Sequence, residues 1–311
     1  MVNKFYASDI FSEWGVGDVR SFNQSPLLKV YTDATITGNG CLSSDNTIIT
    51  ESVHIRGNNI YPYGKPSTGV SATSTVDRAY FFGYSNTSHW GHYLTETLAR
   101  SIHLDMGPIN VYYFGYEITT IKKLYPQHNY IRITSPVKCK TLYVPVPTMV
   151  NLWNVFPEHI NYCQTLGDIY GREILPNKRV YLSRTTQPKS RRWTEGEPDL
   201  EKLLFDAGWK IVHCSQVPPS HQIGYIENAE YLTGCIGSSF HNLMMTRQNP
   251  GNVIYLTCSA KKTNPNYGLH DRLLGNNSLY LDCQIVTKES NKTKKILNPQ
   301  EVFEYLQDTC R

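Results

Sequence analysis

The chain has 311 residues, of which 40% are hydrophobic and 12% aromatic, a composition that excludes disordered and fibrous proteins. Its 30 Lys and Arg residues against 26 Asp and Glu give a formal charge of +4, too small and too dispersed for a nucleic-acid-binding surface. No apolar run approaches the roughly 18 residues of a membrane span, and no secretory signal pattern opens the chain, so we expect a cytoplasmic protein.

The eight cysteines are spread singly, without a Cys-x-x-Cys pair. This spacing is not that of a zinc knuckle or of a dithiol redox centre, so we expect mostly buried thiols.

The first half of the chain begins with short strands and continues as an alternation of strands and helices. Apolar runs bounded by Gly, Asn and Pro predict strands at 27–31, 47–49, 53–55, 79–82, 111–114 and 142–144. Helical periodicity is found at 89–103 and 118–124. The pattern is that of βαβ units.

A second strand–helix series begins at Arg179. It predicts strands at 179–182, 209–213, 231–236 and 253–256, and helices at 198–207, 219–227, 240–246 and 299–306, the last with Asn298 as N-cap. We therefore expect an α/β protein with two domains, 1–165 and 166–311. The last helix is expected to pack back towards the first domain, because its apolar side chains need a partner surface.

The segment Gly237-Ser238-Ser239-Phe240-His241-Asn242-Leu243 follows an apolar strand and opens a predicted helix. Backbone N–H groups and the helix dipole converge at such a point, which favours a phosphate group. Ser238 or Ser239 as a simple helix cap is the alternative, and the two roles are compatible.

An arginine, Arg184, leaves the carboxyl end of the strand Tyr181-Leu182-Ser183, and Arg191 and Arg192 follow in the loop. Ligands of open α/β sheets bind at this edge, and a guanidinium can hold two phosphate oxygens. For Arg191 and Arg192 a solvated basic loop is the alternative.

The segment from Gly91 to Arg100 places His92, Glu96 and Arg100 four residues apart on one helix face. A histidine and a carboxylate in this arrangement can deprotonate a hydroxyl nucleophile, as sugar transfer to an alcohol requires. An exposed Glu–Arg pair beside a capping histidine is the alternative.

The order of these motifs resembles glycosyltransferase family 61. The similar segments are GHYLTETLAR, YLSR with RR close behind, EKLLFDAGWKIV and NAEYLTGCIGSSFHNLMM, within about residues 80–257. His92 and Glu96 match the family's H-x-x-x-[D/E] motif, Arg184 its strand-end arginine, and 238–242 its G-A-G-L-T-N segment. Ser, Ser and His stand at 238, 239 and 241, where Ala, Gly and Thr are more usual.

The resemblance implies a GT-B fold of two facing Rossmann-like domains, inversion at the anomeric carbon and a UDP-sugar donor without an obligatory metal. No two aspartates are separated by a single residue, so the D-x-D motif that holds a nucleotide-bound cation in GT-A enzymes is absent. Asp199-Leu200-Glu201 has the spacing but lies at a predicted helix start. We therefore expect no metal site and no cofactor.

We expect a glycosyltransferase that moves xylose or N-acetylglucosamine from a UDP-sugar to a hydroxyl of a glycan acceptor. Glu96, or failing it His92, is expected to take the acceptor proton, and His89, Trp90 and Arg100 to contact the acceptor. The expected donor-binding residues are Arg184, Arg191, Arg192, Gly237, Ser238, Ser239, Phe240, His241 and Asn242.

A non-catalytic module that binds a nucleotide sugar or a glycan on the same fold is the competing hypothesis. A nucleotide-sugar dehydrogenase or epimerase is disfavoured, because no G-x-G-x-x-G follows a strand.

Overall fold

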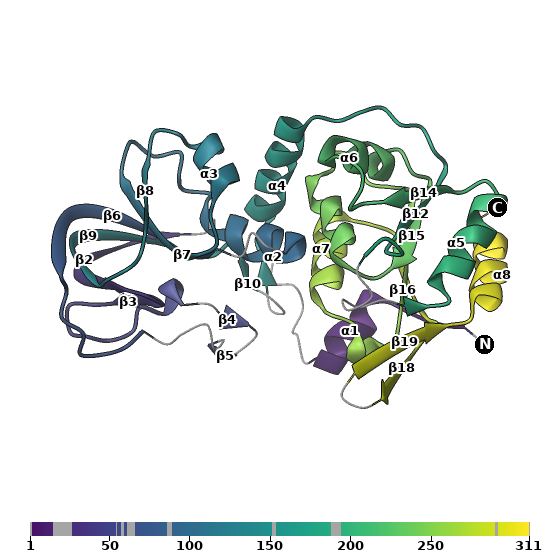
Figure 1. Cartoon of the computed structure of the whole chain (residues 1–311), viewed down its shortest axis with the longest axis horizontal. Helices are drawn as coiled ribbons and strands as arrows, with labels where there is room; N and C mark the ends of the chain where they lie inside the picture. Colours follow the sequence, from purple (N-terminus) through teal and green to yellow (C-terminus); the bar gives the residue numbers. More distant parts are fainter. Residues whose placement is uncertain are drawn as a thin grey trace. The chain divides into compact units, whose positions relative to one another are not determined.

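A computed structural model describes residues 2–14, 27–53, 55–56, 59–60, 66–85, 89–150, 154–187, 194–289 and 292–310. The chain forms two compact α/β units (Figure 1): unit 1 comprises Met1–Val19 and Cys163–Arg311, and unit 2 comprises Arg20–Tyr162. The expected first domain of residues 1–165 is therefore corrected at its start, because the first 19 residues belong with the second half of the chain.

Unit 1 is built on a six-stranded sheet of order β1-β17-β16-β15-β12-β14. Its strands are β1 (Asn3–Phe5), β12 (Arg179–Ser183), β14 (Lys210–His213), β15 (Tyr231–Cys235), β16 (Asn252–Thr257) and β17 (Ser278–Asp282). Five of them run parallel, and β1 adds to the edge antiparallel to β17. The sequence patterns predict β12, β14, β15 and β16 of this sheet, but neither β17 nor the N-terminal strand β1 that pairs with it.

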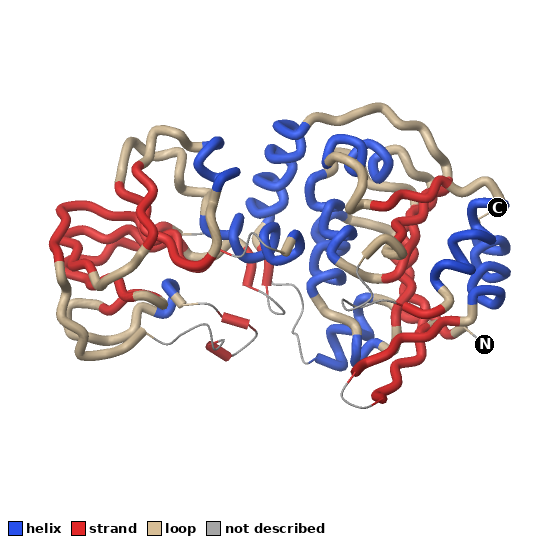
Figure 2. The backbone as a smooth tube through the Cα atoms, in the orientation of Figure 1, coloured by secondary structure: helices blue, strands red, loops and turns tan. Residues whose placement is uncertain are grey.

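Helices cover both faces of this sheet (Figure 2). Alternate strand residues point to opposite faces, so Val180 and Leu182 belong to one buried cluster and Tyr181 to the other. The first cluster includes residues of α1 (Ala7–Trp14), α6 (Pro219–Glu227), the 3₁₀ helix η4 (Ser238–Met245) and α7 (Asn266–Leu274). The second includes residues of α5 (Glu197–Asp206) and α8 (Pro299–Thr309). Buried strands of this kind produce the continuous apolar runs seen in the sequence.

The last helix was expected to pack back towards the first domain, and the structure shows a partner surface for its apolar side chains within unit 1. Val302 and Leu306 of α8 are buried in the same cluster as Leu200 and Leu204 of α5, within unit 1. The predicted N-cap is confirmed, since Asn298 Oδ1 accepts a hydrogen bond from the Glu301 N–H at 3.4 Å. The apolar side chains of α8 therefore pack against α5, a helix that covers the same sheet.

A small second sheet of order β13-β19-β18 also belongs to unit 1. It consists of β13 (Thr194–Glu195), β18 (Gln284–Glu289) and β19 (Lys292–Leu297). A further 3₁₀ turn, η5, covers Ala260–Lys262.

Unit 2 contains a six-stranded mixed sheet of order β3-β2-β9-β6-β7-β8. Its strands are β2 (Leu28–Thr37), β3 (Gly40–Leu42), β6 (Ser74–Ser85), β7 (Asn110–Gly115), β8 (Asn129–Arg132) and β9 (Val137–Pro145). β9, β6, β7 and β8 run parallel, whereas β2 is antiparallel to both of its neighbours. β2 and β3 form an antiparallel hairpin, which explains the β-rich pattern near the start of the chain.

The remaining elements of unit 2 are short. They are the 3₁₀ turn η1 (Thr50–Ser52), the strand pairs β4 (Ile55–Arg56) with β5 (Asn59–Ile60) and β10 (Met149–Val150) with β11 (Asn154–Val155), the helical segments α2 (Trp90–His92), η2 (Tyr93–Thr97) and η3 (Leu98–Arg100), and α3 (Thr119–Leu124). The strand expected at 47–49 reduces to an isolated bridge between Leu42 and Ile48. The division between the units falls inside α4 (Pro157–Tyr170).

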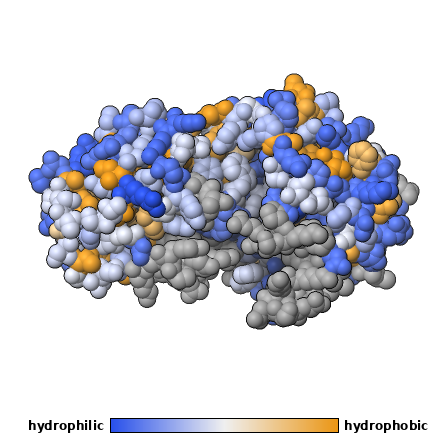
Figure 3. Space-filling view, in the orientation of Figure 1, coloured by the Kyte–Doolittle hydropathy of each residue, from blue (hydrophilic) through white to orange (hydrophobic). Residues whose placement is uncertain are grey.

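All eight cysteines are free thiols, six of them buried, as expected. None of the described helices is both long and apolar enough to cross a membrane. On the face shown in Figure 3, apolar side chains lie in small groups among polar ones.

Candidate functional site

The predicted helix at 89–103 is an irregular succession of turns. One α turn, Trp90–His92, is followed by a π turn, Tyr93–Thr97, and a 3₁₀ turn, Leu98–Arg100. The Leu98 N–H accordingly donates to the Tyr93 carbonyl, five residues back. Single π turns are rare and occur often at functional sites, because the extra residue re-aims the side chains that follow.

His92 and Glu96 form a close polar pair on this segment. His92 Nδ1 lies 2.6 Å from Glu96 Oε1, and the two side chains differ sharply in exposure, 37% for His92 and 6% for Glu96. A carboxylate oxygen accepts, so the hydrogen of a neutral imidazole sits on Nδ1 and the lone pair on Nε2. The more exposed ring is thus oriented by a carboxylate held in the interior.

His89 and Trp90, two expected acceptor contacts, lie beside this pair and are half-buried. The His89 ring meets the His92 ring edge to face at 4.8 Å, and the Trp90 ring stacks on Tyr93 at 5.5 Å. The structure thus gathers His89, Trp90, His92 and Glu96 into one patch of unit 2.

Arg100, the third expected acceptor contact, does not belong to that patch. Its side chain is 5% exposed and donates from Nη1 to the Glu51 carbonyl (2.6 Å) and from Nη2 to the Val53 carbonyl (2.9 Å). Burial lowers the pKa of the Arg100 guanidinium to about 10. The prediction assumed a regular helix, whereas the π turn shifts the residues that follow it around the axis.

In unit 1, Arg184 and Gly237 meet at the carboxyl edge of the sheet. Arg184 follows β12 and Gly237 follows the neighbouring β15, and Arg184 Nη1 donates to the Ile236 carbonyl at 3.0 Å. A Cβ on Gly237 would lie 3.1 Å from Arg184 Nη1. Gly237 has an extended backbone that any residue adopts, so it is the space for the guanidinium that favours glycine here.

The segment after Gly237 differs from the α-helix that we expected. Ser238–Met245 is a 3₁₀ helix without a side-chain cap on its first turn, and Ser238 and Ser239 are half-buried. Gly237, which lies against the Arg184 guanidinium, is thus followed by two half-buried serines whose backbone N–H groups begin a helix, an arrangement that suits an anion.

Phe240 and Asn242 were expected to contact the donor, and the structure places them in the packed interior instead. Phe240 is 1% exposed, with its ring 4.6 Å from that of Tyr255. Asn242 is 1% exposed and donates to Gln222 Oε1 at 2.7 Å. The apolar face of η4 has to fill the core under β15, so the residues after Ser239 turn inward.

His241 is also buried, in a ring cluster with Tyr267 and His270. Its ring lies parallel to the Tyr267 ring at 4.9 Å, and its Nδ1 lies 3.4 Å from His270 Nδ1. Arg191 and Arg192 lie outside the described residues.

Glu197 is a residue of this edge that the sequence did not single out. Its Oε1 accepts hydrogen bonds from the Arg184 backbone N–H at 3.0 Å and from the Tyr181 hydroxyl at 3.2 Å. Glu201, one turn further along α5, accepts from the hydroxyl groups of Ser183 and Thr185. Glu201 of the Asp199-Leu200-Glu201 segment therefore holds the end of β12 and the start of the loop that follows it.

Within the described ranges no group of three or more His, Cys, Asp or Glu side chains is placed to hold a metal ion.

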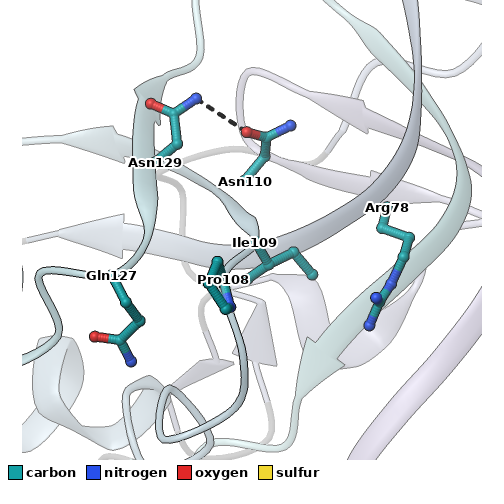
Figure 4. A pocket seen from close by; sticks show the side chains of 6 residues that line it. All are labelled: Arg78, Pro108, Ile109, Asn110, Gln127 and Asn129. Atoms are coloured by element: carbon teal, nitrogen blue, oxygen red, sulfur yellow. Dashed lines mark hydrogen bonds between the residues drawn. The ribbon is translucent and has the colours of Figure 1, made fainter.

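A cavity of about 310 Å³ lies in unit 2, beside the amino-terminal ends of β7 and β8 (Figure 4). It is lined by Arg78, Pro108, Ile109, Asn110, Gln127 and Asn129. Asn110 and Asn129 begin β7 and β8, whereas His89 follows the carboxyl end of β6, which runs parallel to β7. None of the expected site residues lines this cavity.

The family model Glycosyltransferase 61 matches residues 90–255, slightly more than half of the chain. The chain belongs to glycosyltransferase family 61. The matched glycosyltransferase 61 region includes both the His92–Glu96 pair and the Arg184–Gly237 edge. A search of curated proteins finds no significant match.

Among solved structures, the chain is similar to the bacterial iron-containing dodecameric glycosyltransferase TibC from enterotoxigenic E. coli. The identity is 9%, the alignment covers 75% of each chain, and the TM-score is 0.32. A similarity this low supports no argument about the fold or the site of this glycosyltransferase 61 protein.

Proposed function

We propose that this protein transfers xylose or N-acetylglucosamine from a UDP-sugar to a hydroxyl of a glycan acceptor, with inversion at the anomeric carbon. The family supports sugar transfer in general. The single observation that carries the proposal is the His92–Glu96 pair, in which a buried carboxylate orients a half-exposed imidazole. A hydroxyl nucleophile needs such a base at neutral pH.

In this scheme His92 Nε2, rather than Glu96, takes the proton from the acceptor hydroxyl. The acceptor oxygen forms a bond to the anomeric carbon as the bond to the diphosphate oxygen breaks, and the diphosphate leaves with the electron pair. Glu96 holds the ring and stabilises the imidazolium, the role of the carboxylate in a Ser-His-Asp triad. The sequence favoured Glu96 as the base, and the small exposure of its side chain argues for the reverse order.

The leaving diphosphate is proposed to bind at Arg184 and the backbone N–H groups after Gly237. A guanidinium that lies against glycine and amides that begin a helix provide charge-assisted hydrogen bonds to phosphate oxygens. We propose that these groups act without an obligatory metal, and UDP release should then be unchanged by EDTA.

The scheme requires a donor bound by unit 1 to come within reach of His92 on unit 2. We therefore propose the GT-B type of enzyme, in which two domains close on one nucleotide sugar. His89 and Trp90 are the proposed acceptor contacts.

The test is UDP release from UDP-xylose and UDP-N-acetylglucosamine by the purified chain, with water or glycan as acceptor. We expect His92→Gln to lower kcat by about 10²-fold or more while the Kd for UDP stays unchanged. Full turnover in His92→Gln with an inactive Glu96→Gln would make Glu96 the base. UDP binding by the wild-type protein without turnover of any donor would favour the non-catalytic binding module.

A further inference from the structure

The carboxylate of Glu197 lies under the loop that carries Arg184. Glu197 is the first residue of α5 and is 0% exposed. It receives two hydrogen bonds from the end of β12, one from the Tyr181 hydroxyl and one from the Arg184 main chain. The hydrogen bond from its backbone N–H to Glu197 therefore holds the main chain of Arg184 in place.

The start of α5 is itself held in place from the other side. Gly196 precedes Glu197 and has φ +86°, and a Cβ at Gly196 would collide with the Leu297 carbonyl oxygen at the end of β19. Any residue other than glycine would be strained in this conformation. Glu197 consequently has little freedom to follow Arg184, and its position defines where the Arg184 main chain lies.

A carboxylate at this buried position carries a cost that an apolar residue would avoid. Burial raises the pKa of Glu197, and the Arg184 N–H bond and the nearby Arg184 charge act against this shift. Glu197 Oε2 is buried and has no hydrogen-bond partner within the described part of the chain. A buried carboxylate oxygen without a hydrogen bond lowers the stability of the fold. Such groups are expected at functional sites, where the side chain is needed for its position.

We infer that Glu197 is a positioning residue for donor binding: its Oε1 holds the Arg184 main chain so that the guanidinium lies against Gly237. The inference rests on the proposed diphosphate site at Arg184. The geometric link runs from Leu297 through Gly196 and Glu197 to Arg184 and then to Ile236. This position requires a hydrogen-bond acceptor at the end of a side chain as long as glutamate. It does not require the negative charge.

Two conservative variants separate the effect of side-chain length at position 197 from the effect of its negative charge. Glu197→Gln keeps an acceptor oxygen at the same distance and loses the charge, whereas Glu197→Asp keeps the charge and is one methylene too short. We expect Glu197→Gln to bind UDP within about threefold of wild type and Glu197→Asp to lose about tenfold or more, the worth of a hydrogen bond at a charged group. Isothermal titration with UDP measures both, and thermal unfolding verifies that both are folded.

Arg184→Ala and Tyr181→Phe complete the design. If Arg184→Ala loses UDP binding and Glu197→Asp binds UDP as well as wild type, the positioning role is overturned and the donor site stands. If Arg184→Ala also binds UDP normally, the proposed donor site itself fails. Tyr181→Phe removes the second donor to Glu197, together with the contact of the same hydroxyl with Cys235 Sγ, and should leave UDP binding unchanged. A Glu197→Gln variant weaker than Glu197→Asp would assign the effect to charge and contradict the inference.

Discussion

Gly237 shows how one absent side chain shapes the candidate donor site. Its backbone is extended, and the nearest obstacle to a Cβ is the Arg184 guanidinium at 3.1–3.2 Å. We expect Gly237→Ala to displace the guanidinium by a few tenths of an ångström and to weaken UDP binding by roughly 3- to 30-fold, a part of the strength of a charged hydrogen bond. Titration of the folded variant with UDP measures this.

Gly107→Ala is the matched control, because a Cβ at Gly107 meets nothing within 4 Å. It should bind UDP as wild type does. Equal UDP affinity in both glycine variants would show that the guanidinium does not need this space.

His159 links the stability of the protein to pH. It is fully buried, its Nδ1 lies 2.8 Å from Thr148 Oγ1, and burial lowers its pKa from 6.5 to about 4. Between these values the unfolded chain binds more protons than the folded one, so the free energy of unfolding falls as pH drops from 6.5 towards 4. The loss is on the order of 3 kcal/mol.

The prediction is measured by urea unfolding at pH 7 and pH 4.5 for wild type and His159→Gln. The variant is less stable at pH 7 because of altered packing, but its stability should depend less on pH over this window. Parallel pH dependences for the two proteins would contradict the assignment to His159.

The π turn Tyr93–Thr97 lies between the proposed base, His92, and a residue with a structural role, Arg100. His92 and Glu96 stay paired across it, and Arg100 beyond it turns inward to the carbonyls of Glu51 and Val53. The Tyr80 hydroxyl in turn donates to the Arg100 carbonyl at 2.7 Å. This short helical segment is therefore fixed to the turn η1 and to strand β6.

We expect Arg100→Met to destabilise the protein by roughly 3 kcal/mol or more, because two buried carbonyl groups lose their donors. Denaturant unfolding measures the change. Arg132→Met, which removes the charge of an exposed arginine on β8, should change stability by under about 0.5 kcal/mol. A stable Arg100→Met variant would return Arg100 to the candidate acceptor contacts.

The path of the chain between the two units gives the N-terminal segment an unexpected structural role. β1 pairs with β17, Phe5 stacks on Tyr280 at 5.5 Å, and Ile10 of α1 is fully buried in the first cluster of unit 1. Phe11 packs against Gly268 of α7, where a Cβ would lie 3.0 Å from its ring. Residues at the start of the chain thus stabilise the unit formed by its second half.

Ile10→Ala tests this assignment in the full chain. The lost burial should cost about 2–5 kcal/mol, and hydrogen exchange of amides in β15, β16 and β17 should accelerate. Glu13→Ala on the exposed face of the same helix should leave exchange unchanged. Acceleration confined to the sheet of unit 2 would contradict the assignment of the first residues to unit 1.

Local patterns in the sequence were sufficient for four parallel strands of the second series, β12, β14, β15 and β16, and for two pairs of site residues. Buried parallel strands produce apolar runs that end in polar residues or glycine, so Arg184 and Gly237 could be placed at one sheet edge without coordinates. The four-residue spacing brought His92 to Glu96 even though the helix between them is a π turn. Contacts within one turn or at one sheet edge follow from chain geometry alone.

The partners of Arg100, Glu197 and α8 could not be found in this way. Arg100 binds carbonyl groups 47 and 49 residues earlier, and Glu197 reaches an amide 13 residues earlier across a loop. Phe240 and Asn242 turn inward because the core under β15 has to be filled. Such contacts depend on which surfaces are complementary once the whole chain has packed, since a hydrogen-bonding group or apolar stripe specifies what it needs and leaves open which segment supplies it.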